Sequence, residues 1–209
     1  MSDDIPIFYH AAPSRSSVVH WMLEEVGEPF RLEPIDLAKG EQKAPAYLAL
    51  NPMGKVPTLV HRGVVVTEVA AICCYLADVF PAAGLAPALG DPARGSYLRW
   101  LFFSPGALEP AIIDALLQRA AGPAQALGYG DLATTLRVVA AAVTRGPYLL
   151  GERFSAADVV LGACLRWGKL FGSLEMPAEI GSYVERLSAR PALQRAEARD
   201  QELAAARAG

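Results

Sequence analysis

Residues 51–60 read Asn-Pro-Met-Gly-Lys-Val-Pro-Thr-Leu-Val, and Thr-Glu-Val-Ala-Ala-Ile follows at residues 67–72. Proline lacks a backbone N–H, so Pro57 is expected at the first residue of a strand or at a sheet edge. If the Val56–Pro57 peptide bond is cis, the N–H and C=O of Val56 turn away from the sheet and can pair with an extended peptide. A trans proline in an ordinary loop is the alternative for these two residues alone. The acidic residue that opens the next helix favours the first interpretation.

Strand and helix patterns alternate in the N-terminal part of the chain. Short apolar or alternating runs predict four strands, at residues 5–9, 30–35, 58–61 and 64–67. Arg62-Gly63 is a two-residue hairpin signal between the last two. Apolar residues at helical spacing predict one helix after Pro13 that ends at Gly27, and another over residues 69–80. A βαβ unit followed by a hairpin and a helix predicts a sheet with both parallel and antiparallel pairs.

The composition changes to proline, glycine and alanine over residues 81–92, which is typical of a linker, and the patterns beyond it are helical. Pro105-Gly106 should break or kink the first of these helices. In Phe154-Ser155-Ala156-Ala157-Asp158, Ser155 can cap the N–H of Asp158 while the Asp158 carboxylate reaches back. The fold prediction is therefore an α/β domain followed by an all-α domain, with domains at 1–81 and 93–209 and a linker at 82–92.

Bulk properties exclude several classes of protein. The 209 residues are 53% hydrophobic and 20% charged, with a net charge of −3 and no dense Lys/Arg block, which argues against nucleic acid as the partner. No apolar run reaches the roughly 18 residues that span a bilayer, and no signal peptide is visible. Three cysteines suit a reducing compartment, and no metal-ligand spacing is found among His10, His20 and His61. The expectation is a cytoplasmic protein without membrane, nucleic-acid or metal partners.

Taken together, the Val-Pro loop, the Thr-Glu-Val-Ala-Ala-Ile helix opening, the helical half and the Phe-Ser-Ala-Ala-Asp cap resemble the glutathione S-transferase superfamily. The motif Asn-Pro-Met-Gly-Lys-Val-Pro-Thr-Leu is similar to that of bacterial members related to the beta, theta and zeta classes. The likeness covers essentially the whole chain. It implies a thioredoxin-like N-terminal domain that binds glutathione, a helical-bundle C-terminal domain, and a cytoplasmic enzyme that is commonly a homodimer.

The resemblance implies a set of glutathione-binding residues. Glutathione is an extended acidic tripeptide, which can pair with the backbone of Val56 beside Pro57. The N-terminus of the helix near Glu68 offers unpaired N–H groups to its γ-glutamyl carboxylate, and Glu68 suits the neighbouring ammonium. The remaining members are Lys55 and Gln42, for the glycine carboxylate, and Val69. Val69 departs from the family, which usually has Ser there; a lost charge-assisted hydrogen bond corresponds to about 1.5–3 kcal/mol.

Lowering the pKa of a thiol from about 8.5 by two units requires roughly 2.7 kcal/mol of thiolate stabilisation. A helix N-terminus and a hydrogen bond to the anion must act together to supply it. Ser14 is the favoured donor, because it follows Pro13 at the expected N-cap and matches the Ser or Thr of several bacterial relatives. A cap without catalytic function explains Ser14 nearly as well. The alternative donors are Tyr9, Ser16 and Ser17.

Clefts often form at domain interfaces, so the electrophile site is expected between the two halves, with Tyr97, Trp100 and Phe103 as its wall. The function that follows is conjugation of glutathione to a hydrophobic electrophile. A glutathione-dependent isomerase or dehalogenase is a variant of the same chemistry. A catalytically weak or inactive binding or regulatory module of the same fold is the alternative, and Val69 is the residue that favours it.

Overall fold

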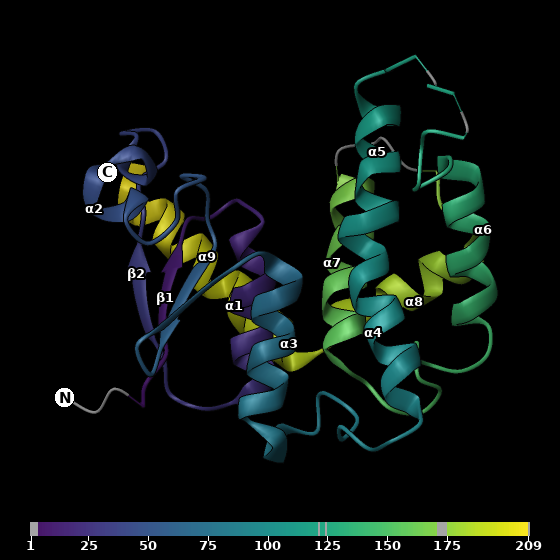
Figure 1. Ribbon diagram of the computed structural model, residues 1–209, viewed down its shortest axis with the longest axis horizontal. Coiled ribbons are helices and arrows are strands. Elements are labelled where there is room, and N and C mark those ends of the chain that lie inside the picture. Colours follow the sequence, from purple (N-terminus) through teal and green to yellow (C-terminus); the bar gives the residue numbers. More distant parts are fainter. Residues whose placement is uncertain (1–3, 121, 124, 171–174, 209) are drawn as a thin grey trace. The chain divides into compact units, whose positions relative to one another are not determined.

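The computed structural model describes residues 4–120, 122–123, 125–170 and 175–208. The first residues, on which the expectation about a signal peptide depends, lie partly outside this range. The chain forms two compact units (Figure 1). One unit is Met1–Ala83 with Pro191–Gly209, and the other is Gly84–Arg190.

The first unit contains a four-stranded sheet in the order β2-β1-β3-β4. Its strands are β1 (Ile7–His10), β2 (Arg31–Pro34), β3 (Thr58–His61) and β4 (Val64–Thr67). β1 and β2 are parallel, whereas β1–β3 and β3–β4 are antiparallel, so the predicted mixed sheet is confirmed. Arg62 and Gly63 both have positive φ, 51° and 75°, as the predicted hairpin turn requires.

Helices α1 (Ser16–Val26) and α3 (Val69–Val79) pack against each other and cover one face of the sheet (Figure 1). Two short helices, η1 (Glu41–Lys43) and α2 (Pro45–Leu48), lie between β2 and β3, and η2 (Pro81–Ala83) follows α3. The apolar side of each long helix is buried because its residues recur at helical spacing. The core includes Phe8, Trp21, Met22, Leu23, Leu59, Ile72 and Leu76.

The last helix, α9 (Pro191–Ala208), belongs to the first unit and packs along α1. This differs from the sequence analysis, which assigned residues 93–209 to one helical domain. The physical reason is a narrow apolar stripe near the start of a largely exposed helix: Ala192, Leu193 and Ala196 are buried. Arg195 of α9 adds an ion pair with Glu24 of α1, with 2.7 Å between Nε and Oε2.

The second unit is helical. Its helices are α4 (Ala93–Phe103), α5 (Glu109–Leu116), α6 (Leu132–Val143), α7 (Ala156–Leu170) and α8 (Ala178–Ser188). The break predicted at Pro105-Gly106 is a π-helical turn, η3 (Ser104–Leu108), between α4 and α5. The expected linker is partly structured, since Leu85 is buried and its carbonyl accepts from the N–H of Ala156 at 2.8 Å. Within the described residues, no helix has the length and apolar character needed to cross a membrane.

The cap of α7 is built around the buried carboxylate of Asp158. It accepts hydrogen bonds from the N–H and hydroxyl of Ser155, each at 2.9 Å, from the N–H of Leu149 and from the hydroxyl of Tyr183. The predicted reach-back of Asp158 is present. The predicted direction at Ser155 is wrong, because its hydroxyl donates to the carboxylate and only its carbonyl accepts from the Asp158 N–H. Burial raises the pKa of Asp158 despite these bonds.

Candidate functional site

The loop before β3 presents an unpaired backbone. The Val56–Pro57 peptide bond is cis. In the part of the chain that the structure describes, neither the N–H nor the C=O of Val56 has a hydrogen-bond partner. The preceding carbonyl, of Lys55, is held by the Tyr47 hydroxyl at 2.6 Å and by Nδ2 of Asn51 at 2.8 Å. The loop is therefore anchored on one side of Val56 and open at Val56 itself.

Gly54 brings the η1 helix against this loop. Its φ is 58°, and a Cβ atom there would lie 2.9 Å from the carbonyl oxygen of Gln42. Nζ of Lys43 also donates to the carbonyl of Met53 at 3.1 Å. This close approach places Gln42 and Lys55 in one region, as the resemblance implies. Oε1 of Gln42 is buried without a hydrogen-bond partner, and the Lys55 side chain is exposed.

The start of α3 has an unusual backbone. Glu68 is its N-cap, with φ 67° and ψ 123°, a conformation that L-residues rarely adopt. The Glu68 side chain is exposed and makes no capping hydrogen bond. Strained residues of this kind persist where the surrounding structure holds them, often at ligand sites. The N–H groups of the first turn of α3 are thus open to an anion, and Val69, half-buried, begins that turn.

Ser14 lies immediately before α1. The N-cap of α1 is Arg15, so the prediction that Ser14 occupies the N-cap is wrong by one residue. Ser14 still serves the helix start, because its Oγ accepts from the N–H of Ser16 at 3.0 Å and its carbonyl accepts from the N–H of Ser17 at 3.1 Å. The Ser14 side chain is half-buried, so its hydroxyl retains access to a ligand.

The alternative donors differ in their surroundings. Ser16 is fully buried, and its hydroxyl contacts both backbone groups of Ala11. The Ser17 hydroxyl donates to Oδ2 of Asp200. Tyr9 is half-buried, with its ring packed edge-on against the ring of Tyr47 at 5.7 Å. Of the three serines, Ser14 therefore has the hydroxyl least committed to the protein interior.

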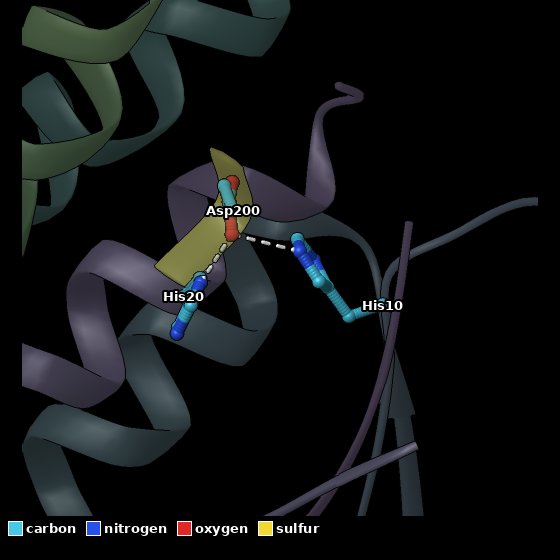
Figure 2. A group of neighbouring side chains, drawn as sticks. All are labelled: His10, His20 and Asp200. Carbon is cyan, nitrogen blue, oxygen red and sulfur yellow. Dashed lines mark hydrogen bonds and ion pairs between the residues drawn. The ribbon is translucent and has the colours of Figure 1, made fainter. Parts of the chain in front are cut away.

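A buried polar cluster lies next to Ser16 and was missed by sequence reasoning. It consists of His10 from β1, His20 from α1 and Asp200 from α9 (Figure 2). Oδ1 of Asp200 lies 2.9 Å from Nε2 of His10 and within hydrogen-bond distance of Nδ1 of His20. The potential metal-ligating atoms of the three residues lie within 4.8 Å of one another. The Asp200 carboxylate is hydrogen-bonded to both histidines and to the hydroxyl of Ser17.

Asp200 is the charged member of this cluster. Burial raises its pKa, but the hydrogen bonds from His10, His20 and Ser17, together with the charge of His10, outweigh that effect and hold the pKa well below its usual value. The carboxylate is therefore ionised at neutral pH. Nothing in local sequence spacing could have indicated the cluster, because Asp200 lies 190 residues from His10.

The residues expected to line an electrophile site lie in α4 of the helical unit. Tyr97 and Trp100 are buried, with 0% and 3% of their surface exposed, and Phe103 is half-buried. Trp100 packs edge-on against Phe103 at 5.3 Å and stacks under the guanidinium of Arg99 at 4.1 Å. In this arrangement Tyr97 presents no surface to a ligand, because its ring is used in packing. Phe103 is the most exposed of the three.

Comparison with known proteins identifies the family. Residues 14–79, from Ser14 to the end of α3, match the family described as "Glutathione S-transferase, N-terminal domain". Glutathione S-transferase 3 of Zea mays is 31% identical over 208 residues, covering 91% of this chain and 92% of that protein. This chain belongs to the glutathione S-transferase family. The predictions of the superfamily and of a glutathione S-transferase enzyme are confirmed.

Other members of the glutathione S-transferase family extend the comparison. Glutathione S-transferase GstA of Escherichia coli O157:H7 is 30% identical and covers 84% of this chain and 89% of that protein. A solved glutathione transferase from Methylococcus capsulatus is 31% identical, with a TM-score of 0.78 over 94% of this chain and 99% of that chain. The prediction of a thioredoxin-like domain followed by a helical domain is thereby confirmed.

Proposed function

We propose that this glutathione S-transferase binds glutathione on its first unit and conjugates it to a hydrophobic electrophile. The observation that carries the proposal is the open backbone of Val56, in the same unit as the strained start of α3 at Glu68. A solved homolog from Sulfitobacter, 26% identical with a TM-score of 0.74 over 93% of this chain and 98% of that chain, contains bound glutathione.

Each polar end of the tripeptide has a candidate partner. The cysteine residue of glutathione pairs, as an extended strand, with the N–H and C=O of Val56 beside Pro57. The γ-glutamyl carboxylate meets the first N–H groups of α3 at Val69, and its ammonium meets the Glu68 carboxylate. The glycine carboxylate meets Lys55 and the amide of Gln42. Only the Nε2 group of Gln42 can donate to that carboxylate, because Oε1 of Gln42, which is buried without a hydrogen-bond partner, is itself an acceptor.

Ser14 is the residue that we propose stabilises the thiolate. Its hydroxyl lies at the start of α1, where the helix dipole favours a negative charge, and its side chain is accessible. The thiolate then attacks the electrophile: a carbon–sulfur bond forms, the bond to the leaving group breaks, and the leaving group departs with the electron pair. No proton transfer to Ser14 is needed, because its hydroxyl only donates a hydrogen bond.

Calorimetric titration with glutathione tests the binding step, and a chromogenic aryl-halide assay tests the chemical step. We expect Ser14→Ala to lower the thiol-dependent rate by about 10- to 100-fold, as expected for a lost hydrogen bond to an anion, with little change in glutathione affinity. Lys55→Ala should weaken binding with little effect on the rate at saturation. A Ser14→Ala enzyme as fast as the wild type would exclude Ser14 and direct attention to Tyr9.

Val69 favours one second candidate, a binding or regulatory module with weak catalysis, because the hydroxyl common at this position is missing. Such a protein would bind glutathione and show no rate above the uncatalysed reaction.

A relative named disulfide-bond oxidoreductase YfcG, from Escherichia coli, is 28% identical over 88% of this chain and 90% of that protein. Activity with a disulfide substrate, and none with aryl halides, would assign this chain to that chemistry instead.

A further inference from the structure

A continuous line of hydrogen bonds connects Ser14 to Asp200. Oγ of Ser14 lies 2.7 Å from Oγ of Ser16, which lies 2.8 Å from Nδ1 of His10. Nε2 of His10 lies 2.9 Å from Oδ1 of Asp200 (Figure 2). Ser16 and His10 are fully buried, so water does not interrupt this line. The charge state at the Asp200 end can therefore affect the hydroxyl at the other end.

The direction of these bonds depends on one proton, at Nδ1 of His10. Because Asp200 is ionised and only accepts, Nε2 of His10 carries a proton. If Nδ1 is bare, the Ser16 hydroxyl donates to it and accepts from the Ser14 hydroxyl. Ser14 then directs its only proton inward. If Nδ1 also carries a proton, it donates to Ser16, and the direction of the Ser14–Ser16 bond must reverse.

The contacts of Ser16 require that reversal. A hydroxyl oxygen accepts about two hydrogen bonds. Oγ of Ser16 already accepts from the N–H of Ala11 at 3.1 Å, so a protonated Nδ1 fills its second position. Ser16 must then donate to Ser14 at 2.7 Å, in preference to the more distant carbonyl of Ala11 at 3.0 Å. Oγ of Ser14 then accepts from both the hydroxyl and the N–H of Ser16, so the proton of the Ser14 hydroxyl points outward.

Of the two histidines, His10 has the hydrogen-bond partners that an imidazolium needs. A buried carboxylate beside two imidazoles is stabilised when one of them is an imidazolium. A buried imidazolium needs an acceptor at each nitrogen, and His10 has two, Asp200 and Ser16. Among the described residues, His20 has a hydrogen-bond partner only at Nδ1. The additional proton that makes one of the two imidazoles an imidazolium is therefore better accommodated on His10 than on His20.

We propose that His10 and Asp200 are positioning residues for the reaction: the Asp200 carboxylate keeps His10 doubly protonated, and His10, through Ser16, turns the Ser14 hydroxyl outward as a donor to the glutathione thiolate. This rests on the proposed role of Ser14. It assigns α9, the last helix of the chain, a function in the chemistry of the N-terminal unit. No bond is made or broken by His10 or Asp200, and neither contacts the substrate.

The first test needs no substrate. In ¹⁵N-histidine-labelled wild-type protein at neutral pH, long-range proton–nitrogen correlation spectra should show both ring nitrogens of His10 protonated, with His10→Asn used to assign the signal. In Asp200→Asn, which keeps the shape but removes the charge, His10 should become neutral. A neutral His10 in the wild type would overturn the proposal.

The second test measures the thiolate of bound glutathione by its ultraviolet absorbance as a function of pH. Asp200→Asn should raise the pKa of the bound thiol by about one pH unit, which is a tenfold smaller ionisation constant of that thiol. The matched control is Arg195→Ala, which removes another polar contact between α9 and α1 and should leave the thiol pKa unchanged. Equal pKa values in the wild type and Asp200→Asn would overturn the proposal. A wild-type protein that binds no glutathione would overturn the proposed function. The spectra of the first test would still decide whether His10 is charged.

Discussion

Nε2 of His10, in the first strand, lies 2.9 Å from Oδ1 of Asp200, in the last helix. Helix α9 therefore joins the N-terminal unit by a polar contact with β1 as well as by its packing against α1. The carboxylate is held by three donors, one from β1 and two from α1. A helix that was expected to belong to the C-terminal helical domain therefore contributes the central charge of a buried cluster.

The first prediction concerns the pH dependence of stability. The pKa of Asp200 is lower in the folded protein than in the unfolded chain, so its ionised form stabilises the fold at pH values above the unfolded pKa of about 4. We expect the difference in unfolding free energy between the wild type and Asp200→Asn to be largest above that pH and to shrink as the pH falls below it. Urea titrations at several pH values measure this difference. A difference that grows in acid would contradict the assignment.

A second prediction uses Ser14 as a probe of where the thiol lies. Ser14→Cys places a thiol near the start of α1, where a thiolate is favoured, and it should form a mixed disulfide with oxidised glutathione by displacing one glutathione thiolate. Mass spectrometry detects the adduct. The matched control is Ser17→Cys, one helical turn on, which should react much more slowly because that side chain faces Asp200. Equal rates in the two variants would contradict the proposed position of the thiol.

Substitution of Glu68 should have opposite effects on the stability of the fold and on glutathione binding. Its φ of 67° is strained for glutamate and ordinary for glycine. We expect Glu68→Gly to raise the unfolding free energy by about 1 kcal/mol and to weaken glutathione binding, since the carboxylate opposite the ammonium is lost. Denaturant titration and calorimetry measure the two effects. Unchanged affinity in Glu68→Gly would remove Glu68 from the proposed site.

Val69 offers a gain of function. Val69→Ser supplies a hydroxyl in the first turn of α3, where it can donate to the γ-glutamyl carboxylate, and should lower the dissociation constant for glutathione by about tenfold. Val69→Ala is the control, because it removes the valine side chain without adding a hydrogen-bond donor. If both variants bind glutathione as the wild type does, the carboxylate does not lie at this helix start.

The helical unit depends on the buried cap at Asp158. Asp158→Ala leaves the N–H groups of Leu149 and Ser155 and the Tyr183 hydroxyl without their acceptor, and should cost about 3–5 kcal/mol of unfolding free energy. The exposed cap at Asp131, which accepts from the N–H of Thr134 at 2.7 Å, is the matched control. Asp131→Ala should cost about 1 kcal/mol. Similar losses in the two variants would contradict the importance of burial.

The candidate site could be predicted from sequence to the extent that its residues are close in the chain. Val56, Pro57, Glu68 and Val69 lie within one loop-hairpin-helix segment, so the turn and helix signals located them together. Gln42 needed the tertiary contact at Gly54 before its nearness to Lys55 could be seen. The assignment of Ser14 to the N-cap was one residue off, because a serine can support a helix start from either of two adjacent positions. The class within the superfamily, the homodimer and the cytoplasmic location stay predictions.

Local periodicity and turn chemistry in the sequence were enough to determine the mixed sheet, the hairpin at Arg62-Gly63, the helical second half and the Asp158 cap. The strand, helix, turn and cap signals behind these predictions come from residues a few positions apart, whose backbone preferences act before the chain is compact. Only the tertiary structure decided that α9 joins the first unit and that Asp200 meets His10 and His20. Those pairings depend on packing between helix and strand surfaces that are distant in sequence. Once Asp200 is buried, its carboxylate must be hydrogen-bonded to the groups that packing brings next to it.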